Sequence, residues 1–422
     1  MTDAREISPV SAPIEATVRL PGSKSITNRA LVTAALARVG GVSRLIDPLE
    51  GEDTVVMRRG LRTLGVIIDD VDDPWLVLGT GGRLTGGVTI DAGASGTTAR
   101  FLTAVGALAD REVTVDGTER MRQRPIGDLA NALVQLGVRV VCETGAPPIT
   151  VEGPVSERRT TVSGARSSQF LTALLLIAPM LGEQIEIEVV EGLVSAAYVT
   201  GTVEVMEAFG ADIGRSETGF TVAPTGYEPA HFDIEPDASA SVYPAVGVAI
   251  AGGRVVMPGI PATSTQPDLA VLGVLEEMGV TVTRTASSII VESGGAPLRG
   301  VDADLSGAPD GSLAVAVACL FADGPSRLRG LGTLRVKESD RLAALQTELR
   351  RLGAEAEIEG GDLVIHPRRL HAATVETYDD HRMAMSFSLA GLVVDGVSIR
   401  DPECVAKTWP RYFEALEAMC RN

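Results

Sequence analysis

The chain has 422 residues, of which 45% are hydrophobic and 22% charged, so we expect two globular domains and no extensive disorder. A formal charge of −18 argues against nucleic acid or an anionic membrane surface as the main partner. The four cysteines (Cys142, Cys319, Cys404 and Cys420) have neither metal-ligand nor disulfide spacing, and the longest apolar run, 170–181, is too short to cross a bilayer. We therefore expect a cytoplasmic protein.

Three glycine turns in the first half precede apolar helical patterns, at residues 22–25, 93–96 and 164–167. The first glycines of successive turns, Gly22, Gly93 and Gly164, are 71 residues apart in both intervals. Such turns are expected to leave backbone N–H groups unpaired at the positive end of the helix dipole. With Lys24, Arg29 and Arg100 nearby, they predict a pseudo-threefold scaffold for phosphates or carboxylates.

A second periodicity covers the whole chain. Five helical patterns end in a large apolar residue and a glycine, at positions 65, 137, 210, 279 and 353, with spacings of 72, 73, 69 and 74 residues. A glycine there is typical of a left-handed helix stop. The pattern predicts a unit of strand, helix, strand, helix and two strands, repeated six times.

The second half begins its helices with aspartates instead of glycine turns: Asp237, Asp310 and Asp380, spaced 73 and 70 residues apart. We therefore predict an α/β protein with a first domain at 19–230 and a discontinuous second domain at 1–18 plus 231–422. The sixth unit ends early, after a helix at 409–419. Residues 13–20 are expected to supply its missing strands.

Residues 20–29 form the densest candidate site. Lys24 would act as a point charge, Ser25 as a hydrogen-bond donor and Arg29 as a planar fork for an anion. The alternative is a capped helix start with two solvated cations. Among Arg120, Arg122 and Arg124, exposed and solvated side chains are the common outcome, but one could reach an anion.

Each of the three aspartates could be a helix cap or a general base, and the residues alone do not choose among them. Residues 335–341 are expected to begin a helix, with Lys337 and Arg341 on one face and Glu338 one position round. A surface ion-pair lattice is the alternative there. The four histidines are scattered, at positions 231, 366, 371 and 381, and no metal site is predicted.

Taken together, these motifs resemble the 5-enolpyruvylshikimate-3-phosphate synthase family (3-phosphoshikimate 1-carboxyvinyltransferase). The resemblance runs in order along the chain, at residues 20–25, 28–29, 124–126, 167–171, 335–341, 380–384 and 406–408. It implies two inside-out, barrel-like α/β domains, each of three βαβαββ units. It also implies an active site in the interdomain cleft.

The resemblance assigns residues to two substrates. Implied shikimate 3-phosphate contacts are Lys24, Ser25, Arg29, Ser167, Ser168, Gln169, Ser195, Asp310 and Lys337. Implied phosphoenolpyruvate contacts are Lys24, Gly96, Arg124, Gln169, Arg341, Arg382 and Lys407.

The implied reaction is an addition–elimination through a tetrahedral intermediate. Asp310 takes the position of the general base, and Glu338 or Lys24 that of the proton donor. No metal or organic cofactor is implied, and we expect a monomer. A phosphate-releasing enzyme of the shikimate pathway, which supplies aromatic amino acids, is therefore the expected function.

Four positions depart from the family pattern. Ala94 replaces a frequent asparagine, Ala196-Ala197 replace a basic residue and a proline, Thr333 stands where asparagine is common, and Phe101 replaces a proline. The first three remove potential substrate contacts. Glyphosate response is not readable from position 101.

Two other functions compete with this one. The first is the sister activity on UDP-N-acetylglucosamine, whose family carries an essential cysteine on a mobile loop. Cys142 here lies in a strand-like run instead. The second is a catalytically dead anion-binding protein on the same scaffold, which retention of Asp310, Glu338 and Lys407 together disfavours.

Overall fold

The computed structural model describes residues 4–421, and the chain divides into two compact units. One, the glycine-turn unit, is Gly22–Ile234; the other, the aspartate unit, is Met1–Pro21 with Glu235–Asn422. Their hydrophobic cores have no residue in common. No helix of the described residues is long and apolar enough to cross a membrane.

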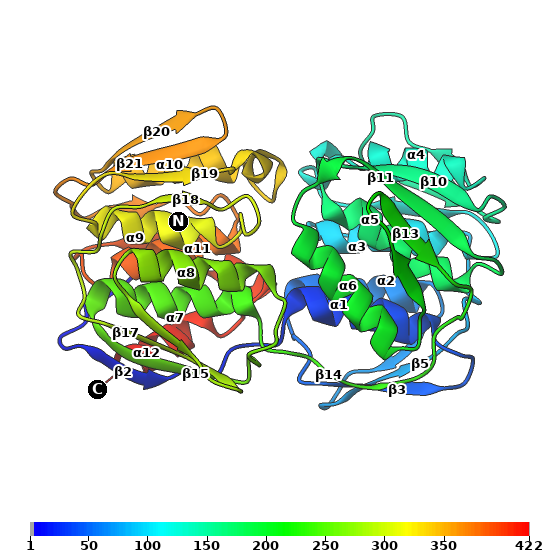
Figure 1. The fold of residues 1–422 in the computed structure, drawn as a ribbon, viewed down its shortest axis with the longest axis horizontal. Helices are drawn as coiled ribbons and strands as arrows, with labels where there is room; N and C mark the ends of the chain where they lie inside the picture. Colours follow the sequence, from blue (N-terminus) through cyan, green and yellow to red (C-terminus); the bar gives the residue numbers. More distant parts are fainter. Residues whose placement is uncertain (1–3, 422) are drawn as a thin grey trace. The chain divides into compact units, whose positions relative to one another are not determined.

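The glycine-turn unit contains three βαβαββ repeats (Figure 1). In chain order its elements are α1 (Lys24–Leu36), β3 (Val42–Ile46), α2 (Glu52–Thr63), β4 (Ile67–Asp69), β5 (Trp75–Leu78), β6 (Val88–Asp91), α3 (Gly96–Gly106), β7 (Val113–Asp116), η1 (Met121–Gln123), α4 (Gly127–Gln135), β8 (Arg139–Val141), β9 (Ile149–Glu152), β10 (Arg159–Gly164), α5 (Ser168–Ile177), η2 (Ala178–Met180), β11 (Ile185–Leu193), α6 (Ala196–Ala208), β12 (Ile213–Arg215), β13 (Gly219–Val222) and β14 (His231–Asp233).

The aspartate unit repeats the plan. Its elements are β1 (Ala4–Glu6), β2 (Ile14–Thr17), α7 (Ala238–Ala251), β15 (Gly253–Pro258), η3 (Pro267–Leu269), α8 (Ala270–Glu277), β16 (Thr281–Arg284), β17 (Ser288–Ser293), β18 (Asp302–Asp304), α9 (Ser312–Ala318), η4 (Cys319–Phe321), β19 (Ser326–Arg329), η5 (Gly332–Val336), α10 (Arg341–Arg351), β20 (Glu355–Glu359), β21 (Asp362–His366), β22 (Thr374–Val375), α11 (His381–Ala390), β23 (Ser398–Arg400), η6 (Pro402–Lys407) and α12 (Tyr412–Cys420).

Each repeat builds a small mixed sheet. In the order β6-β7-β9-β8, the first two strands are parallel and the others antiparallel. The parallel pair β6–β7 needs a crossover, which α3 supplies. The sheets β10-β11-β13-β12 and β18-β19-β21-β20 have the same order. The predicted α/β class and its recurring unit are confirmed.

The first helix of each repeat is buried on nearly all sides. Every residue of α3 and all but one of α7 are buried, although α7 contains Pro244. The second helix is amphipathic: in α2 and α4 only part of the residues are buried. Figure 1 shows the first helices enclosed within each unit, with the sheets outside. This inside-out arrangement places the starts of the buried helices, where the candidate residues lie, at one end of each unit.

The predicted helix stops are confirmed by backbone geometry. Gly65, Gly137, Gly210, Gly279 and Gly353 have φ values of 91°, 84°, 86°, 101° and 109°. Side chains other than glycine are strained there. Each stop ends the second helix of its repeat and turns the chain into the next hairpin.

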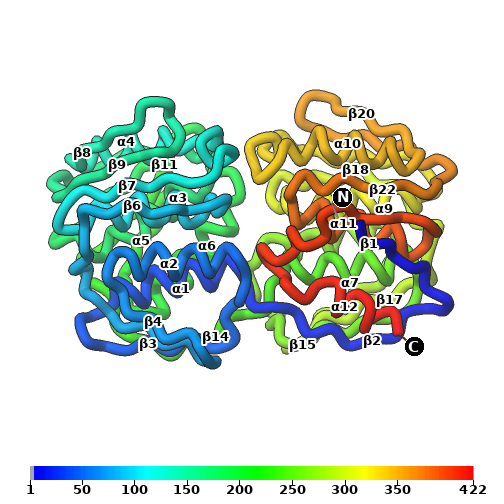
Figure 2. The backbone as a smooth tube through the Cα atoms, turned by 180° about the vertical axis from the view of Figure 1, so that it is seen from behind, coloured from blue at the N-terminus to red at the C-terminus, as the bar shows by residue number. Residues whose placement is uncertain are grey.

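The chain ends pair differently from our expectation. Residues 13–20 were expected to complete the sixth repeat, but β2 lies parallel to β15 in the sheet of the fourth (Figure 2). The sixth sheet, β1-β23-β22, is completed by β1. Likewise β14 lies parallel to β3, so residues 231–233 belong with the first repeat and not with the second domain. An alternating pattern predicts a strand but not its partner.

Candidate active site

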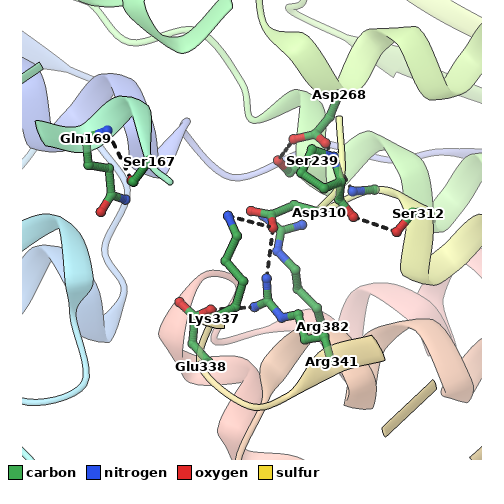
Figure 3. A network of polar contacts seen from close by, with 12 residues as sticks. Ser167, Gln169, Ser239, Asp268, Asp310, Ser312, Lys337, Glu338, Arg341 and Arg382 are labelled. Carbon is green, nitrogen blue, oxygen red and sulfur yellow. Dashed lines mark hydrogen bonds and ion pairs between the residues drawn. The ribbon is translucent and has the colours of Figure 1, made fainter. Parts of the chain in front are cut away.

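A cluster of charges surrounds Asp310 in the aspartate unit (Figure 3). The carboxylate oxygen Oδ1 lies 2.9 Å from Nη1 of Arg341 and 3.4 Å from Nζ of Lys337. The other oxygen, Oδ2, lies 3.5 Å from Nη2 of Arg382. The side chain of Asp310 is 17% exposed and that of Lys337 is 29% exposed, so the cluster remains open to a ligand.

Asp310 differs from its two counterparts at helix starts. Asp237 and Asp380 cap α7 and α11 by accepting hydrogen bonds from the N–H groups of Ser239 and Arg382. In α9 the capping residue is Gly311, and no side chain caps this helix. The structure therefore separates Asp310 from the capping role that sequence symmetry allowed for all three.

The cations around Asp310 favour its ionised form. Burial raises the pKa of a carboxyl group, but Lys337, Arg382 and Arg341 outweigh burial and hold the pKa of Asp310 well below its usual range. At neutral pH the carboxylate can accept a proton. Because the cations stabilise the unprotonated form, an incoming anion would raise this pKa and strengthen the base.

Arg341 is enclosed by three carboxylates. Its Nε and Nη2 donate to the two oxygens of Asp380 at 2.7 and 3.1 Å, and Nη2 also lies 2.9 Å from Oε2 of Glu338. Burial lowers the pKa of a guanidinium, but Asp380, Glu338 and Asp310 outweigh it and raise the pKa of Arg341. Its side chain is 1% exposed, so in this arrangement Arg341 orders the carboxylates.

The segment before α10 is not the helix that we expected. Residues 332–336 form the short η5, and α10 begins only at Arg341, with Asp340 as its side-chain cap. Lys337 and Arg341 therefore do not share a helix face. They meet because both contact Asp310, a residue from another repeat.

Two further cations lie close by along the chain. Arg382 is in the first turn of α11, and its Nη1 is 3.5 Å from the hydroxyl of Tyr243, whose pKa burial raises to about 12. Lys407, the last residue of η6, is buried, and η6 packs against α11.

In the glycine-turn unit, α1 begins without a side-chain cap. The hydroxyl of Ser23 makes no capping bond and is buried without a hydrogen-bond partner. Lys24, the first helical residue, pairs instead with Asp53 of α2 at 3.3 Å. Gly22 is required here because a Cβ would lie 2.3 Å from the carbonyl oxygen of Asp47.

The other two glycine turns are partly capped, contrary to our expectation. Ser95 accepts from the N–H of Thr98, and Ser167 accepts from the N–H of Gln169. Free N–H groups at all three starts are therefore a wrong prediction. A serine one residue before a helix favours capping, which the glycine pattern obscured.

Arg29 is buried among neutral oxygens. Its Nε donates to Oγ1 of Thr202 at 2.7 Å, and the Nη groups donate to the carbonyls of Ser25 and Tyr198 at 2.8 and 3.2 Å. Within residues 4–421, no carboxylate lies within 4 Å of this guanidinium. Burial lowers its pKa to about 10.

Arg124 passes close to Gly96 at the start of α3. Of the three clustered arginines, Arg120 and Arg122 bind Gln123 and Asp116 at the surface, while Arg124 is buried and donates to the carbonyl of Ala94 at 3.2 Å. A Cβ on Gly96 would lie 2.5 Å from Nη2 of Arg124.

The remaining predicted residues lie at the starts of α5 and α6. Ser167 and Ser168 begin α5, and the Gln169 side chain reaches Oγ1 of Thr97 in α3 at 3.3 Å (Figure 3). Ser195 precedes α6 in a left-handed conformation with φ 53°.

Sequence reasoning missed two acidic residues, Asp53 and Asp268. Asp53 is 3% exposed and pairs with Lys24, and its place in the first turn of α2 suggested only a dipole interaction. Asp268 bonds Ser239 and the N–H of Gly311. A following proline-rich loop gave no signal for either contact. Among residues 4–421, no group of three or more His, Cys, Asp or Glu side chains could hold a metal ion.

Comparisons with known proteins point in one direction. A family model described as EPSP synthase (3-phosphoshikimate 1-carboxyvinyltransferase) matches residues 9–416. The chain is 42% identical to the 3-phosphoshikimate 1-carboxyvinyltransferase of Janthinobacterium sp. over 94% of each chain. It is 41% identical to that of Edwardsiella ictaluri over 100% of this chain and 99% of that one.

Solved structures agree on the fold. The EPSP synthase of Acinetobacter baumannii superposes with a TM-score of 0.82 at 24% identity, covering 98% of this chain and 97% of the other. The enolpyruvyl transferase NikO of Streptomyces tendae gives a TM-score of 0.78 at 18% identity, covering 99% and 97%.

Proposed function

Because the chain belongs to the EPSP synthase (3-phosphoshikimate 1-carboxyvinyltransferase) family, we propose that Asp310 and the cations around it carry out that family's reaction. The enzyme transfers the enolpyruvyl group of phosphoenolpyruvate to the 5-hydroxyl of shikimate 3-phosphate, releasing inorganic phosphate, in the shikimate pathway. The substrate contacts assigned by resemblance, from Lys24 to Lys407, are part of this proposal. We propose further that the protein is a cytoplasmic monomer.

The first step is an addition. Asp310 accepts the proton of the 5-hydroxyl as its oxygen bonds to C2 of phosphoenolpyruvate, while C3 receives a proton from Glu338 or Lys24. The observation that carries this step is the carboxylate of Asp310, which faces three cations and caps no helix.

The second step is an elimination. The tetrahedral intermediate loses a proton from C3, the C2–O bond to phosphate breaks, and the C2–C3 double bond is restored. Arg124, Arg341, Arg382 and Lys407 are proposed to bind the departing phosphate. Fixed charges of this kind act without reorganising as the substrate charge moves.

Local charge explains how an acidic protein binds two anions. Arg29 and Arg124 lie buried with carbonyl and hydroxyl acceptors, so the charge of each is available to a substrate. Lys337 is the most exposed of the cations on Asp310. The formal charge of −18 is spread over the chain and is screened by salt, whereas buried cations are screened little.

The cysteine expected of the competing UDP-N-acetylglucosamine activity is not activated here. Cys142 lies just after β8, its thiol contacts the carbonyl of Ala146 at 3.6 Å, and burial raises its pKa. A raised thiol pKa disfavours the reactive thiolate.

The test is release of inorganic phosphate. The purified protein is expected to release phosphate only when shikimate 3-phosphate and phosphoenolpyruvate are both present. UDP-N-acetylglucosamine is expected not to replace shikimate 3-phosphate. Absence of release with both substrates would favour the anion-binding alternative.

The same assay tests the base. Asp310→Asn is expected to lower kcat by about 10²–10⁴-fold, because the amide cannot accept the proton. Circular dichroism should show an unchanged fold, since Asp310 caps no helix. A variant with normal turnover and a lowered melting temperature would assign Asp310 a structural role.

A further inference from the structure

Asp268 is a buried carboxylate beside the proposed base. It lies in η3 with 2% of its surface exposed, and its Oδ1 accepts the N–H of Gly311 at 3.1 Å. Its Oδ2 accepts the hydroxyl of Ser239. Gly311 follows Asp310 directly and is the capping residue of α9, so Asp268 binds the backbone of the turn that carries the base (Figure 3).

The equivalent turns have no such external partner in their capping bonds. Asp237 and Asp380 each accept from the N–H two residues further along, at 2.9 and 3.0 Å. For Asp310 the corresponding group is the N–H of Ser312, which donates to the carbonyl of Pro309 at 3.2 Å. The start of α9 is therefore satisfied without the side chain of Asp310.

Packing holds this turn close to η3. A Cβ on Gly311 would lie 2.5 Å from Cγ2 of Val271 and 3.2 Å from Oδ1 of Asp268. The glycine thus permits the backbone to approach the carboxylate, and any larger residue would force the two apart.

We propose that Asp268 is a positioning residue that substitutes for the cap of α9 and so keeps Asp310 directed at Lys337, Arg341 and Arg382. This inference rests on the proposed function, because Asp310 must be the base for its direction to matter. Without Asp268, Gly311 loses a charged acceptor, and the carboxylate of Asp310 can turn to cap α9 as Asp237 and Asp380 cap their helices.

The experiment is a double-mutant cycle on kcat. Asp268→Ala is expected to lower kcat by about 10- to 100-fold, as small misplacements of a catalytic group do, while KM for each substrate changes less than about threefold. Asp268→Asn keeps an oxygen that can accept from Gly311 and is expected to retain at least about a third of kcat. In an Asp310→Asn background, Asp268→Ala is expected to lower kcat by less than about threefold further.

Asp110→Ala is the matched control, because Asp110 also accepts a glycine N–H, that of Gly86, at 2.6 Å, far along the chain from the proposed base. It is expected to lower the melting temperature and leave kcat unchanged. If Asp268→Ala does not fold, Asp268→Ser replaces it in the cycle, since the serine side chain is shorter but polar.

Two results would overturn the inference: a kcat within about threefold of wild type in folded Asp268→Ala, or an equal loss in the wild-type and Asp310→Asn backgrounds. Failure of the proposed function is distinguishable, because Asp310→Asn would then itself retain wild-type turnover.

Discussion

Arg29 illustrates how a single residue can be kept for binding at a cost in stability. The guanidinium is 4% exposed and is bonded to one hydroxyl and two carbonyls, with no ion-pair partner in residues 4–421. Burying a charge without an opposite charge is unfavourable, and the lowered pKa of about 10 reflects it. At neutral pH Arg29 is still protonated, so an anion would supply the missing charge.

Arg29→Met therefore separates stability from binding. We expect its melting temperature, in a buffer free of phosphate and sulfate, to equal or exceed that of wild type, because a neutral side chain of similar length fills the site. KM for shikimate 3-phosphate should rise by about 10- to 100-fold, the value of a charge-assisted hydrogen bond. Calorimetry and steady-state kinetics measure the two effects.

A loss of more than about 5 °C in the Arg29→Met variant would contradict this account, since it would show that the charge stabilises the substrate-free fold. Arg29→Lys is the control. It keeps the charge but loses the planar fork, so it should recover part of the binding.

The start of α3 shows how an element positions a cation. Gly96 is its first residue, and the guanidinium groups of Arg100 and Arg124 lie where a Cβ would be, at 2.4 and 2.5 Å. Arg100 is anchored to the carbonyls of Gly96 and Pro125 at 3.0 and 2.9 Å. Arg124, held by the carbonyl of Ala94, is the side chain that must move if a methyl group is added.

Gly96→Ala is thus expected to displace Arg124 and raise KM for phosphoenolpyruvate by about tenfold or more, while KM for shikimate 3-phosphate changes less. The fold should survive, because the ends of long side chains can move. Gly273→Ala in α8 is the matched control: its added Cβ meets nothing within 4 Å, so it should stabilise the protein by about 0.5–1 kcal/mol without kinetic effect. Equal effects of Gly96→Ala on both substrates would contradict the assignment of Arg124.

At the scale of the molecule, the two hydrophobic cores are separate and the aspartate unit is discontinuous. The glycine-turn unit is one continuous segment, closed by pairing of β14 with β3. The aspartate unit instead needs the amino-terminal segment, because β2 pairs with β15 and β1 with β23.

Residues 22–234 expressed alone are therefore expected to fold with a single cooperative thermal transition, measured by circular dichroism, and to release no phosphate. Residues 235–422 alone are expected to lack a cooperative transition, because β15 and β23 lose their partners. Cooperative folding of residues 235–422 without the amino-terminal segment would show that these strands are dispensable.

Local features of the sequence determined the repeat, the helix stops and most of the strands. The αL glycines, the hairpin 354–365 and the strand 42–46 were all predicted within a residue, because apolar periodicity and glycine act on neighbouring residues. The family motifs likewise named the charged residues that meet at Asp310.

Tertiary structure alone decided which aspartate caps no helix, which cations have carboxylate partners and which strand completes which sheet. Asp268 and Gly311 are 43 residues apart, and β14 pairs with a strand some 187 residues earlier, as its backbone contact from Ala230 to Ser43 shows. Such contacts depend on how repeats pack against one another. Since Asp237, Asp310 and Asp380 share the same local pattern, only the different neighbours supplied by packing could make Asp310 face the cations.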